Sequence, residues 1–292
     1  MVGSDGQGGM KRIGVLLADV KNPFWQAKKE QYLKAAPSFG FELFFREAAD
    51  SGDAAAQSHE LMRMTEEDYD AVILNPLTDD NLLPALGALP FPAFDVGPKC
   101  DPERTRGLKN YFPLVAADFE GQGALVGDAL VSEVKDAGEG WALIVGGFCG
   151  ARQSILRCRG AFKAFQRVFP LERIVTLHAD FDRKKAFRAV RELSSRLTLR
   201  AVFCANDLMA LGAVEALKEC ESPLATPVPV GGVDAIPEAL EALQDGRLFC
   251  TVHLPHEELV NGVLRSISSW FQGDFFSTSR MPLARSVLMR RS

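Results

Sequence analysis

The sequence lacks any apolar run of about 18 to 20 residues, the length that a helix needs to cross a bilayer. It also lacks an excess of positive charge, because 33 Lys and Arg face 38 Asp and Glu, for a formal net charge of −5. Binding to nucleic-acid phosphates needs clustered positive charge. The basic runs at 183–185 and 290–291 are short. We therefore predict that nucleic acid is not a partner.

Signatures of enzymes and metal sites are also missing. The four histidines, His59, His178, His253 and His256, are spread along the chain. His253 and His256 precede Glu257 but have no third metal ligand at a diagnostic spacing. The dinucleotide fingerprint GxGxxG, the phosphate loop GxxxxGK[ST] and the nucleophile elbow GxSxG are absent. We predict a protein without metal, without cofactor and without catalytic activity.

The six cysteines form no C-x-x-C pair. Cys204 and Cys250 lie in apolar, strand-like runs, which predicts buried structural thiols. Cys149 and Cys158 flank a loop and a helix start, and their spacing leaves a disulfide between them open. This number of free thiols is unusual for an exported protein, and it counts mildly against a periplasmic location.

The first ten residues, MVGSDGQGGM, are polar and rich in glycine. A secretory signal has a charged start and an apolar stretch, and neither is present here. We interpret residues 1–10 as a leader or a remnant of cloning. Whether the protein is an exported one with its signal removed or a cytoplasmic one stays open on this evidence.

The chain has 292 residues, a length that suits two domains of ordinary size. Short apolar runs alternate with helical patterns, which predicts parallel strands covered on both faces, a doubly wound α/β architecture. Helices are predicted at about 23–39 and at 54–64, and a helix at 256–274 is expected to return to the first half. No Pro/Gly/Ser-rich linker separates the halves, so a hinge is expected. The predicted strands are 13–18, 41–45, 71–76, 91–96 and 111–118, then 141–147, 174–180, 201–207 and 228–234.

In open parallel sheets, ligands gather at the carboxyl ends of the strands. The residues that follow the apolar runs are amides, carboxylates, one arginine and aromatics. Asn and Asp bind neighbouring hydroxyls, Arg supplies fixed donors, and aromatic rings pack on the apolar faces of a sugar. The sequence therefore predicts a sugar-binding site built from Asn22, Phe24, Trp25 and Asn75, from Arg152, Phe181, Asn206 and Asp234, and more weakly from Asp19 and Asp95.

Structural roles compete with these assignments. Phe24 and Trp25 open a predicted helix, where aromatic residues more often pack in the core. Asn206 is placed to cap the following helix, and Asp234 is placed for an Asx turn. Arg152 falls in the first turn of a helix, where its charge opposes the helix dipole. That placement favours a binding role, although a surface ion pair would also explain it.

Seven segments together carry a family resemblance. The chain resembles the type I periplasmic sugar-binding proteins, and among them the ribose-binding group most closely. The resemblance implies two Rossmann-like lobes joined by three hinge crossovers, near Ala116, His253 and Met281, with a sugar enclosed by closure of the lobes. The lobes would comprise 11–116 with 254–281, and 117–253 with 282–292. The matching segments, in family order, are 22–25, 73–80, 115–123, 150–162, 179–186, 201–217 and 230–255.

The resemblance also bears on the ligand. It implies that the residues predicted above, apart from Asp19 and Asp95, contact the sugar, together with His253, which stands near a hinge where the family usually has Gln. Gly97-Pro98 stand where the family commonly has Asp-Arg, and Val233 replaces a usual aromatic. The expected ligand is therefore a sugar or polyol that need not be ribose.

The function expected from these features is solute binding. The protein would capture a small sugar or polyol by hinge closure and deliver it to the membrane permease of an ABC transporter or to a receptor. It would act as a monomer in the periplasm or facing the cell exterior. Two alternatives are the effector-binding core of a lac-repressor-like regulator, which would need an N-terminal helix-turn-helix, and the sensor domain of a signalling receptor.

Overall fold

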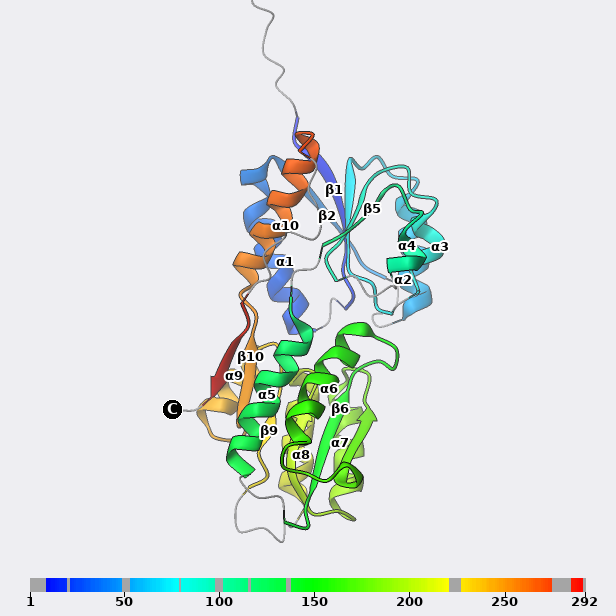
Figure 1. Cartoon of the computed structure of the whole chain (residues 1–292). Coiled ribbons are helices and arrows are strands. Elements are labelled where there is room, and N and C mark those ends of the chain that lie inside the picture. The colour runs from blue at the N-terminus through cyan, green and yellow to red at the C-terminus, as the bar shows by residue number, and fades with distance from the viewer. Residues whose placement is uncertain are drawn as a thin grey trace, which may run out of the picture. The chain divides into compact units, whose positions relative to one another are not determined.

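The computed structural model describes residues 9–19, 22–48, 53–78, 80–97, 102–114, 117–134, 138–220, 227–274 and 285–290. The chain divides into two compact units (Figure 1), Met1–Ala116 with His256–Pro282, and Ala117–Pro255 with Leu283–Ser292. The chain therefore passes between the units three times. The crossovers expected near Ala116 and Met281 lie outside the described residues.

Unit 1 is an α/β unit whose described strands form a five-stranded sheet in the order β2-β1-β3-β4-β5, with all neighbours parallel. Every residue of β3 is buried, as expected for a strand covered on both faces. The strands are β1 (Lys11–Leu16), β2 (Phe41–Arg46), β3 (Ala71–Leu74), β4 (Ala93–Asp95) and β5 (Tyr111–Pro113). The helices are α1 (Pro23–Ala35), η1 (Ala36–Phe39), α2 (Ala54–Met64), α3 (Leu83–Leu86), α4 (Pro102–Thr105) and α10 (His256–Phe271).

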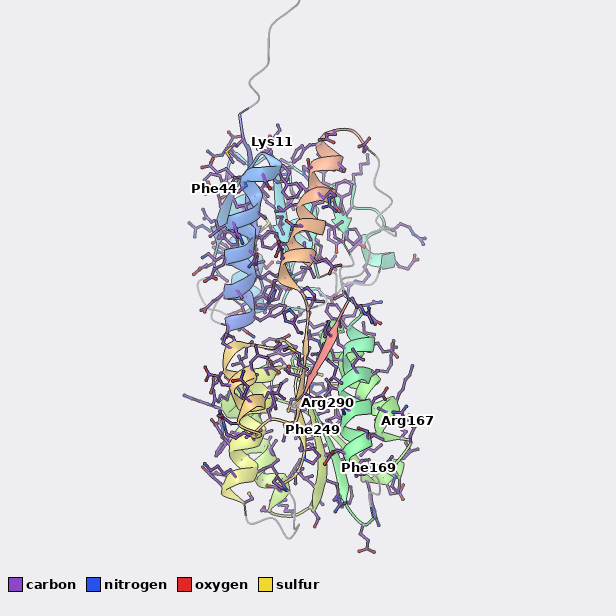
Figure 2. The ribbon with its side chains drawn as sticks, turned by 90° about the vertical axis from the view of Figure 1, so that its left-hand side faces the viewer. Lys11, Phe44, Arg167, Phe169, Phe249 and Arg290 are labelled. Atoms are coloured by element: carbon purple, nitrogen blue, oxygen red, sulfur yellow. The ribbon has the colours of Figure 1, made fainter. Side chains whose placement is uncertain are left out.

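Helix α10 comes from the far end of the sequence and packs beside α1, as predicted (Figure 2). The Phe24 and His256 rings at the starts of the two helices lie 4.8 Å apart between centroids. At the other end of α10, the centre of the Phe271 ring lies 5.4 Å from the ammonium of Lys11, the first residue of β1. Helix α10 therefore belongs to the core of unit 1 and not to unit 2.

Unit 2 repeats the pattern with a sheet in the order β11-β10-β9-β8-β6-β7 among the residues described. One edge strand departs from the parallel arrangement, because β11 pairs antiparallel with β10. This last strand is short and only partly buried, and its apolar run of 287–289 is too short to predict it. The strands are β6 (Trp141–Gly146), β7 (Ile174–His178), β8 (Leu199–Cys204), β9 (Val230–Gly231), β10 (Cys250–His253) and β11 (Val287–Arg290). The helices are α5 (Phe119–Val134), α6 (Arg152–Phe165), η2 (Leu171–Arg173), α7 (Arg183–Ser194), α8 (Asp207–Glu219) and α9 (Pro237–Gln244).

Local chemistry explains most of the boundaries. The predicted helix at 23–39 becomes α1 followed by the short η1, and it ends at Gly40, whose φ of 74° needs the freedom of glycine. Helices α5 and α6 pack so closely that a Cβ at Gly123 would lie 1.8 Å from the carbonyl oxygen of Arg157. That close approach fixes where Arg157 enters the core of unit 2.

The cysteines behave largely as the apolar pattern indicates. Cys204 and Cys250 are fully buried, so the prediction of structural thiols is confirmed. Burial raises the pKa of the Cys250 thiol to about 12. Cys149 and Cys158 are free thiols, which closes the question of a disulfide between them.

Candidate functional site

The predicted residues of unit 1 all lie at the carboxyl edge of its sheet. Asn22, Phe24 and Trp25 stand at the start of α1, in the connection that follows β1. Asn75 follows β3 directly. The weaker candidates are there too, because Asp19 lies between β1 and α1 and Asp95 is the last residue of β4. Parallel topology thus brings residues from three strand ends to one edge, where such sheets bind ligands.

Asn22 both starts α1 and keeps a donor group. Its Oδ1 accepts a hydrogen bond from the Phe24 amide at 3.0 Å, and Pro23 follows at the first helical position. The side chain is buried, and within the described residues its Nδ2 group has no hydrogen-bond partner. Capping therefore uses the oxygen of this amide and leaves the nitrogen to donate elsewhere.

Asn75 is held in place through its backbone. The buried Gln57 side chain donates to the carbonyl oxygen of Asn75 at 2.9 Å and to that of Leu17 at 3.2 Å. The same amide accepts from the Leu77 backbone at 2.9 Å, which joins the loops after β1 and β3. The Oδ1 atom of Asn75 is buried and has no donor within the described residues. Because an unsatisfied buried acceptor is unfavourable, this oxygen is suited to a ligand hydroxyl.

Phe24 and Trp25 are half-buried, which is less than core packing alone would produce. Their rings meet edge to face, with centroids 5.0 Å apart and planes at 87°. Phe24 also packs on His256, so one ring is anchored by α10. This pair provides rigid apolar surface beside the polar groups of Asn22.

Asp95 is held inside unit 1. It is 1% exposed, its Oδ2 accepts from the Tyr111 hydroxyl at 2.6 Å, and its Oδ1 accepts from the Gly97 amide at 2.9 Å. These bonds join β4 to β5 and fix the turn after β4. The structure thus gives Asp95 an architectural role. The backbone oxygen of Asp19 accepts from the Asn22 amide at 3.4 Å, which shapes the approach to α1.

In unit 2, a buried arginine that was not among the predicted residues reaches the carboxyl edge of the sheet. Arg157 is 6% exposed and donates to the Ala205 carbonyl oxygen at 2.8 Å and to the Gln122 side chain at 2.9 Å. Its remaining nitrogen lies 3.4 Å from Oδ1 of Asp234. Arg157 therefore connects α5 with the ends of β8 and β9.

The predicted arginine, Arg152, is exposed in the first turn of α6, as its position indicated. Helical periodicity would have favoured Arg157 instead. It shares the buried face of α6 with Ser154, Ala161 and Ala164, at intervals of three and four residues. An arginine on a buried helix face needs acceptors, and strand ends provide them.

Asn206 fulfils the capping role considered for it in the sequence and keeps one side-chain atom without a partner in the described part of the chain. Its Oδ1 caps α8 by accepting from the Met209 amide at 3.0 Å, so the capping hypothesis is confirmed. Its Nδ2 is buried and has no acceptor in the described part of the chain. Like Asn75, Asn206 presents one unsatisfied amide atom directly after a buried strand.

Backbone strain coincides with two predicted residues. Phe181 has a φ of 58° and Asp234 a φ of 118°, and Asp180 and Ala235 beside them are also positive. Such conformations in non-glycine residues are unfavourable by about 1–3 kcal/mol each, and they gather at functional sites. The local fold is therefore maintained by the interactions around these residues.

The interactions around Asp234 show what holds it. The Ile236 amide, which an Asx turn would direct to Asp234, instead donates to Oδ2 of Asp207 at 3.0 Å. The Asx-turn alternative is therefore wrong. Asp207 also accepts from the Thr251 hydroxyl at 2.7 Å. Burial raises the pKa of Asp207 to about 6 and that of Asp234 to about 7, the latter against the favourable charge of Arg157.

Phe181 and His253 complete the predicted set in unit 2. The Phe181 ring is half-buried, meets Phe148 edge to face at 5.7 Å, and lies so close to Gly147 that a Cβ there would be 2.2 Å from it. His253 is the last residue of β10 and is half-buried, and burial lowers its pKa. Phe181 follows β7, as predicted, and His253 ends β10, a strand that the predicted series did not include.

Comparison with known proteins agrees with this arrangement. Residues 13–268 match the model of the periplasmic binding protein domain. The chain belongs to this family. The predicted resemblance and the predicted α/β fold of two sheets flanked by helices are thereby confirmed.

Individual relatives share the length of this binding protein as well as its fold. The D-allose-binding periplasmic protein of Escherichia coli K12 is 26% identical over 243 residues, 82% of this chain and 77% of that protein. The ribose import binding protein of Salmonella typhimurium is 28% identical over 260 residues, 86% of this chain and 82% of that protein. A periplasmic solute-binding protein from Actinobacillus succinogenes, solved with bound D-allose, has a TM-score of 0.83 at 21% identity and covers 96% of this chain and 97% of its own.

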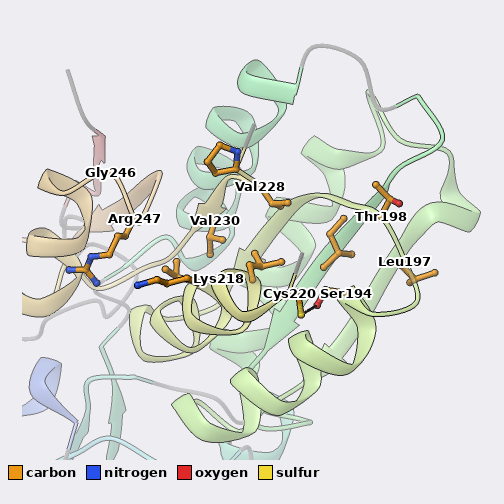
Figure 3. Close-up of a pocket in the computed structure, with 13 residues that line it drawn as sticks. Ser194, Leu197, Thr198, Lys218, Cys220, Val228, Val230, Gly246 and Arg247 are labelled. Atoms are coloured by element: carbon orange, nitrogen blue, oxygen red, sulfur yellow. Dashed lines mark hydrogen bonds between the residues drawn. The ribbon is translucent and has the colours of Figure 1, made fainter. Parts of the chain in front are cut away.

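One cavity of this binding protein lies away from the predicted residues. It has a volume of about 410 Å³ and is lined by the beginnings of β8 and β9 and the end of α8, including Leu199, Val230 and Cys220 (Figure 3). It thus sits at the amino edge of the second sheet, opposite the edge that carries Asn206 and Asp234. No helix in the described part of the chain is long and apolar enough to span a membrane.

Proposed function

We propose that the chain is a solute-binding protein that captures one small sugar or polyol with residues of both units. The ligand is contacted by Asn22, Phe24, Trp25 and Asn75 in unit 1, and by Arg157, Phe181, Asn206, Asp234 and His253 in unit 2. Arg152 stays a weaker candidate. The protein acts without cofactor or catalysis, as a monomer, in the periplasm or facing the cell exterior.

The observation that carries this proposal is the pair of unsatisfied buried amide atoms. Asn75 presents an acceptor and Asn206 a donor, each directly after a buried strand of its own sheet. A hydroxyl group both donates and accepts, so a ligand with several hydroxyls satisfies both atoms. The names of relatives that bind allose and ribose support the same ligand class.

Rings accompany the polar groups in both units. The Phe24–Trp25 pair and the Phe148–Phe181 pair each offer apolar surface held by edge-to-face packing. A pyranose, furanose or inositol ring has apolar C–H faces between its hydroxyls, and aromatic rings pack on such faces. This combination favours a cyclic polyol over a fully apolar or peptide ligand.

Closure provides the mechanism. A ligand that contacts both units interacts fully with the protein only when the units close on it, so binding shifts the population toward the closed state. The closed form then docks on a membrane permease of an ABC transporter, or on a receptor, which reads the ligand through the shape of the protein. No covalent step is required of any residue.

Thermal-shift screening tests the proposal. The panel contains neutral pentoses, hexoses, inositols and linear polyols, together with sugar acids. A true ligand at a hundredfold excess over its dissociation constant stabilises the folded state by about 2.7 kcal/mol. Lys163→Ala, an exposed position that pairs with Glu120, is the control and keeps the response. The proposal is wrong if no member of the whole panel raises the melting temperature.

A further inference from the structure

Unit 1 holds a buried lysine for which the proposed sugar contacts give no reason. Lys28 lies one turn into α1 and is 3% exposed. Within the described residues, its ammonium group forms no hydrogen bond and no ion pair with a carboxylate. The contacts that it does make there are with two aromatic rings. Its Nζ lies 4.8 Å from the centre of the Trp25 ring and 6.0 Å from that of Phe24.

The direction of this side chain follows from helix geometry. Side chains on a helix tilt toward its N-terminus, and the rings that Lys28 contacts belong to the first turn of α1. The ammonium group therefore lies at the end of α1 that follows β1, beside the rings proposed to pack on the ligand. It is a charged group directed toward the proposed site.

The amides at this helix end are already occupied. The Phe24 amide donates to Oδ1 of Asn22, and the Trp25 and Gln26 amides donate to its backbone oxygen at 2.9 Å and 3.2 Å. Pro23 has no amide hydrogen. An anion at this place would therefore meet the charge of Lys28 and not the free amides of a helix end.

In the absence of a ligand, burial of the charged Lys28 side chain without a counter-charge is unfavourable for folding. Burial lowers the pKa of Lys28 from 10.5 to about 7, because the charged form loses its hydration. The positive end of the helix dipole adds to this cost, and the two rings offset only part of it. A bound anion would favour the charged form of Lys28, because it would supply the missing counter-charge.

We propose that the ligand carries a carboxylate and that Lys28 binds it, so that the preferred ligand class is a sugar acid, an aldonate or a uronate. This inference rests on the proposed function and narrows it. A single lysine matches the single charge of a carboxylate, whereas a sugar phosphate brings up to two charges. Lys28 then determines specificity, while the amides and rings hold the hydroxyls and the sugar ring.

Isothermal titration with matched pairs tests this proposal: galacturonate against galactose, gluconate against glucose, and glucose 6-phosphate as a second anion. At least one acid is expected to bind at least tenfold more tightly than its neutral partner. Lys28→Met removes the charge at similar length and is expected to abolish that preference. Lys29→Met is the matched control on the same helix, because Lys29 pairs with Glu47 at 3.3 Å, and it keeps the preference.

A second readout separates a binding role from a structural one. If Lys28 serves an anionic ligand, Lys28→Met raises the melting temperature of the ligand-free protein while it weakens binding of the acid. Binding of neutral sugars without the acids, tighter binding of the phosphate, or an unchanged acid preference in Lys28→Met would each overturn the inference and leave the proposed function standing. If no sugar, polyol or sugar acid binds, both fail.

Discussion

The two units present their candidate binding residues in different ways. In unit 2, Arg157 bonds to α5, to the end of β8 and to Asp234, and Asp207 bonds to Thr251 and to the loop after β9. In unit 1, the side chains of Asn22 and Asn75 have partly unused amides, and the Lys28 ammonium contacts the rings of Phe24 and Trp25 without a hydrogen bond or ion pair among the described residues. The charged candidates of unit 2 are thus held in a bonded network before the ligand arrives, whereas Lys28 of unit 1 is not, and each unit keeps one unsatisfied amide atom, at Asn75 and at Asn206.

This contrast separates stability from affinity. A polar side chain inside a bonded network supports the fold as well as the ligand, because its removal leaves its partners buried and unsatisfied. A side chain without internal partners supports the ligand alone. Substitutions of the networked residues Arg157 and Asp234 in unit 2 are therefore expected to affect both properties, and substitutions that remove only an unsatisfied atom or a half-buried ring, as at Asn75 and Trp25 in unit 1, chiefly affinity.

The largest effect is expected for Arg157→Met. The substitution leaves Asp234 and the Ala205 carbonyl without their donor, so the free energy of unfolding should fall by about 3–5 kcal/mol in urea denaturation. Arg159→Met on the same helix is the control, because Arg159 is exposed and pairs with Glu120. It should change stability by about 1 kcal/mol or less. Equal effects of the two substitutions would show that the bonds of Arg157 do not support the fold of unit 2.

The next largest effect concerns pH. Asp207 and Asp234 have raised pKa values in the folded state, so the native protein holds more protons than the unfolded chain between pH 5 and 7. Stability should fall as pH rises through that window, since these two groups outweigh the lowered pKa of His253. Lys28 acts in the opposite sense, because its lowered pKa means that the unfolded chain holds the extra proton between pH 7 and 9.

The ligand-free protein should therefore be least stable near pH 7. Thermal unfolding between pH 5 and 8, below the range in which the buried thiols Cys158, Cys204 and Cys250 oppose the effect of Lys28, measures this profile. Asp234→Asn should flatten the acidic limb, which belongs to unit 2, and Lys28→Met the alkaline limb, which belongs to unit 1. A stability maximum at pH 7 would contradict the assigned pKa directions.

Trp25→Ala tests whether an aromatic ring of unit 1 contributes to affinity more than to stability. Loss of the ring should weaken ligand binding about tenfold, equivalent to about 1.4 kcal/mol, because the substitution removes apolar contact with the ligand. Stability should change much less than in Arg157→Met, since the ring is half-buried. Leu33→Ala, at an exposed position of the same helix, is the control for calorimetry. Unchanged affinity in Trp25→Ala would assign the ring to packing alone.

Asn206 allows its two roles to be separated. Asn206→Ser keeps an oxygen that caps α8 and removes the unsatisfied Nδ2, so affinity should fall while stability changes by about 0.5 kcal/mol or less. Asn206→Ala also loses the cap and should be less stable by about 1 kcal/mol. Urea denaturation and calorimetry on both variants distinguish these effects. Full affinity in Asn206→Ser would show that the cap is the whole role of this residue.

The sequence predicted the helices and strands well where apolar runs and cap residues marked them. Helix α2 has the predicted bounds, and the carboxyl-end rule placed Asn75 and Asn206 beside their strands. Strands β4 and β9 are shorter than their apolar runs, because flanking apolar residues are buried in loops without pairing. Sequence patterns report burial more directly than they report strand pairing.

The details of the candidate site were harder to predict from the sequence. Arg157 was missed because three arginines share one segment, and only the buried face of α6 distinguishes them. The positive φ values at Phe181 and Asp234 have no sequence mark, since neither residue is glycine. The isolation of Lys28 depends on which side chains pack around it. Such features arise from tertiary contacts, which residue types and spacing do not encode one by one.

The most direct test of the account is a calorimetric titration of the best ligand against Asn75→Ala and Asn206→Ser, one substitution from each unit. If one ligand is held by both units, each variant folds with nearly unchanged stability and binds at least tenfold more weakly than the parent protein. If either substitution leaves the affinity unchanged while the other abolishes binding, a ligand held by both units is contradicted.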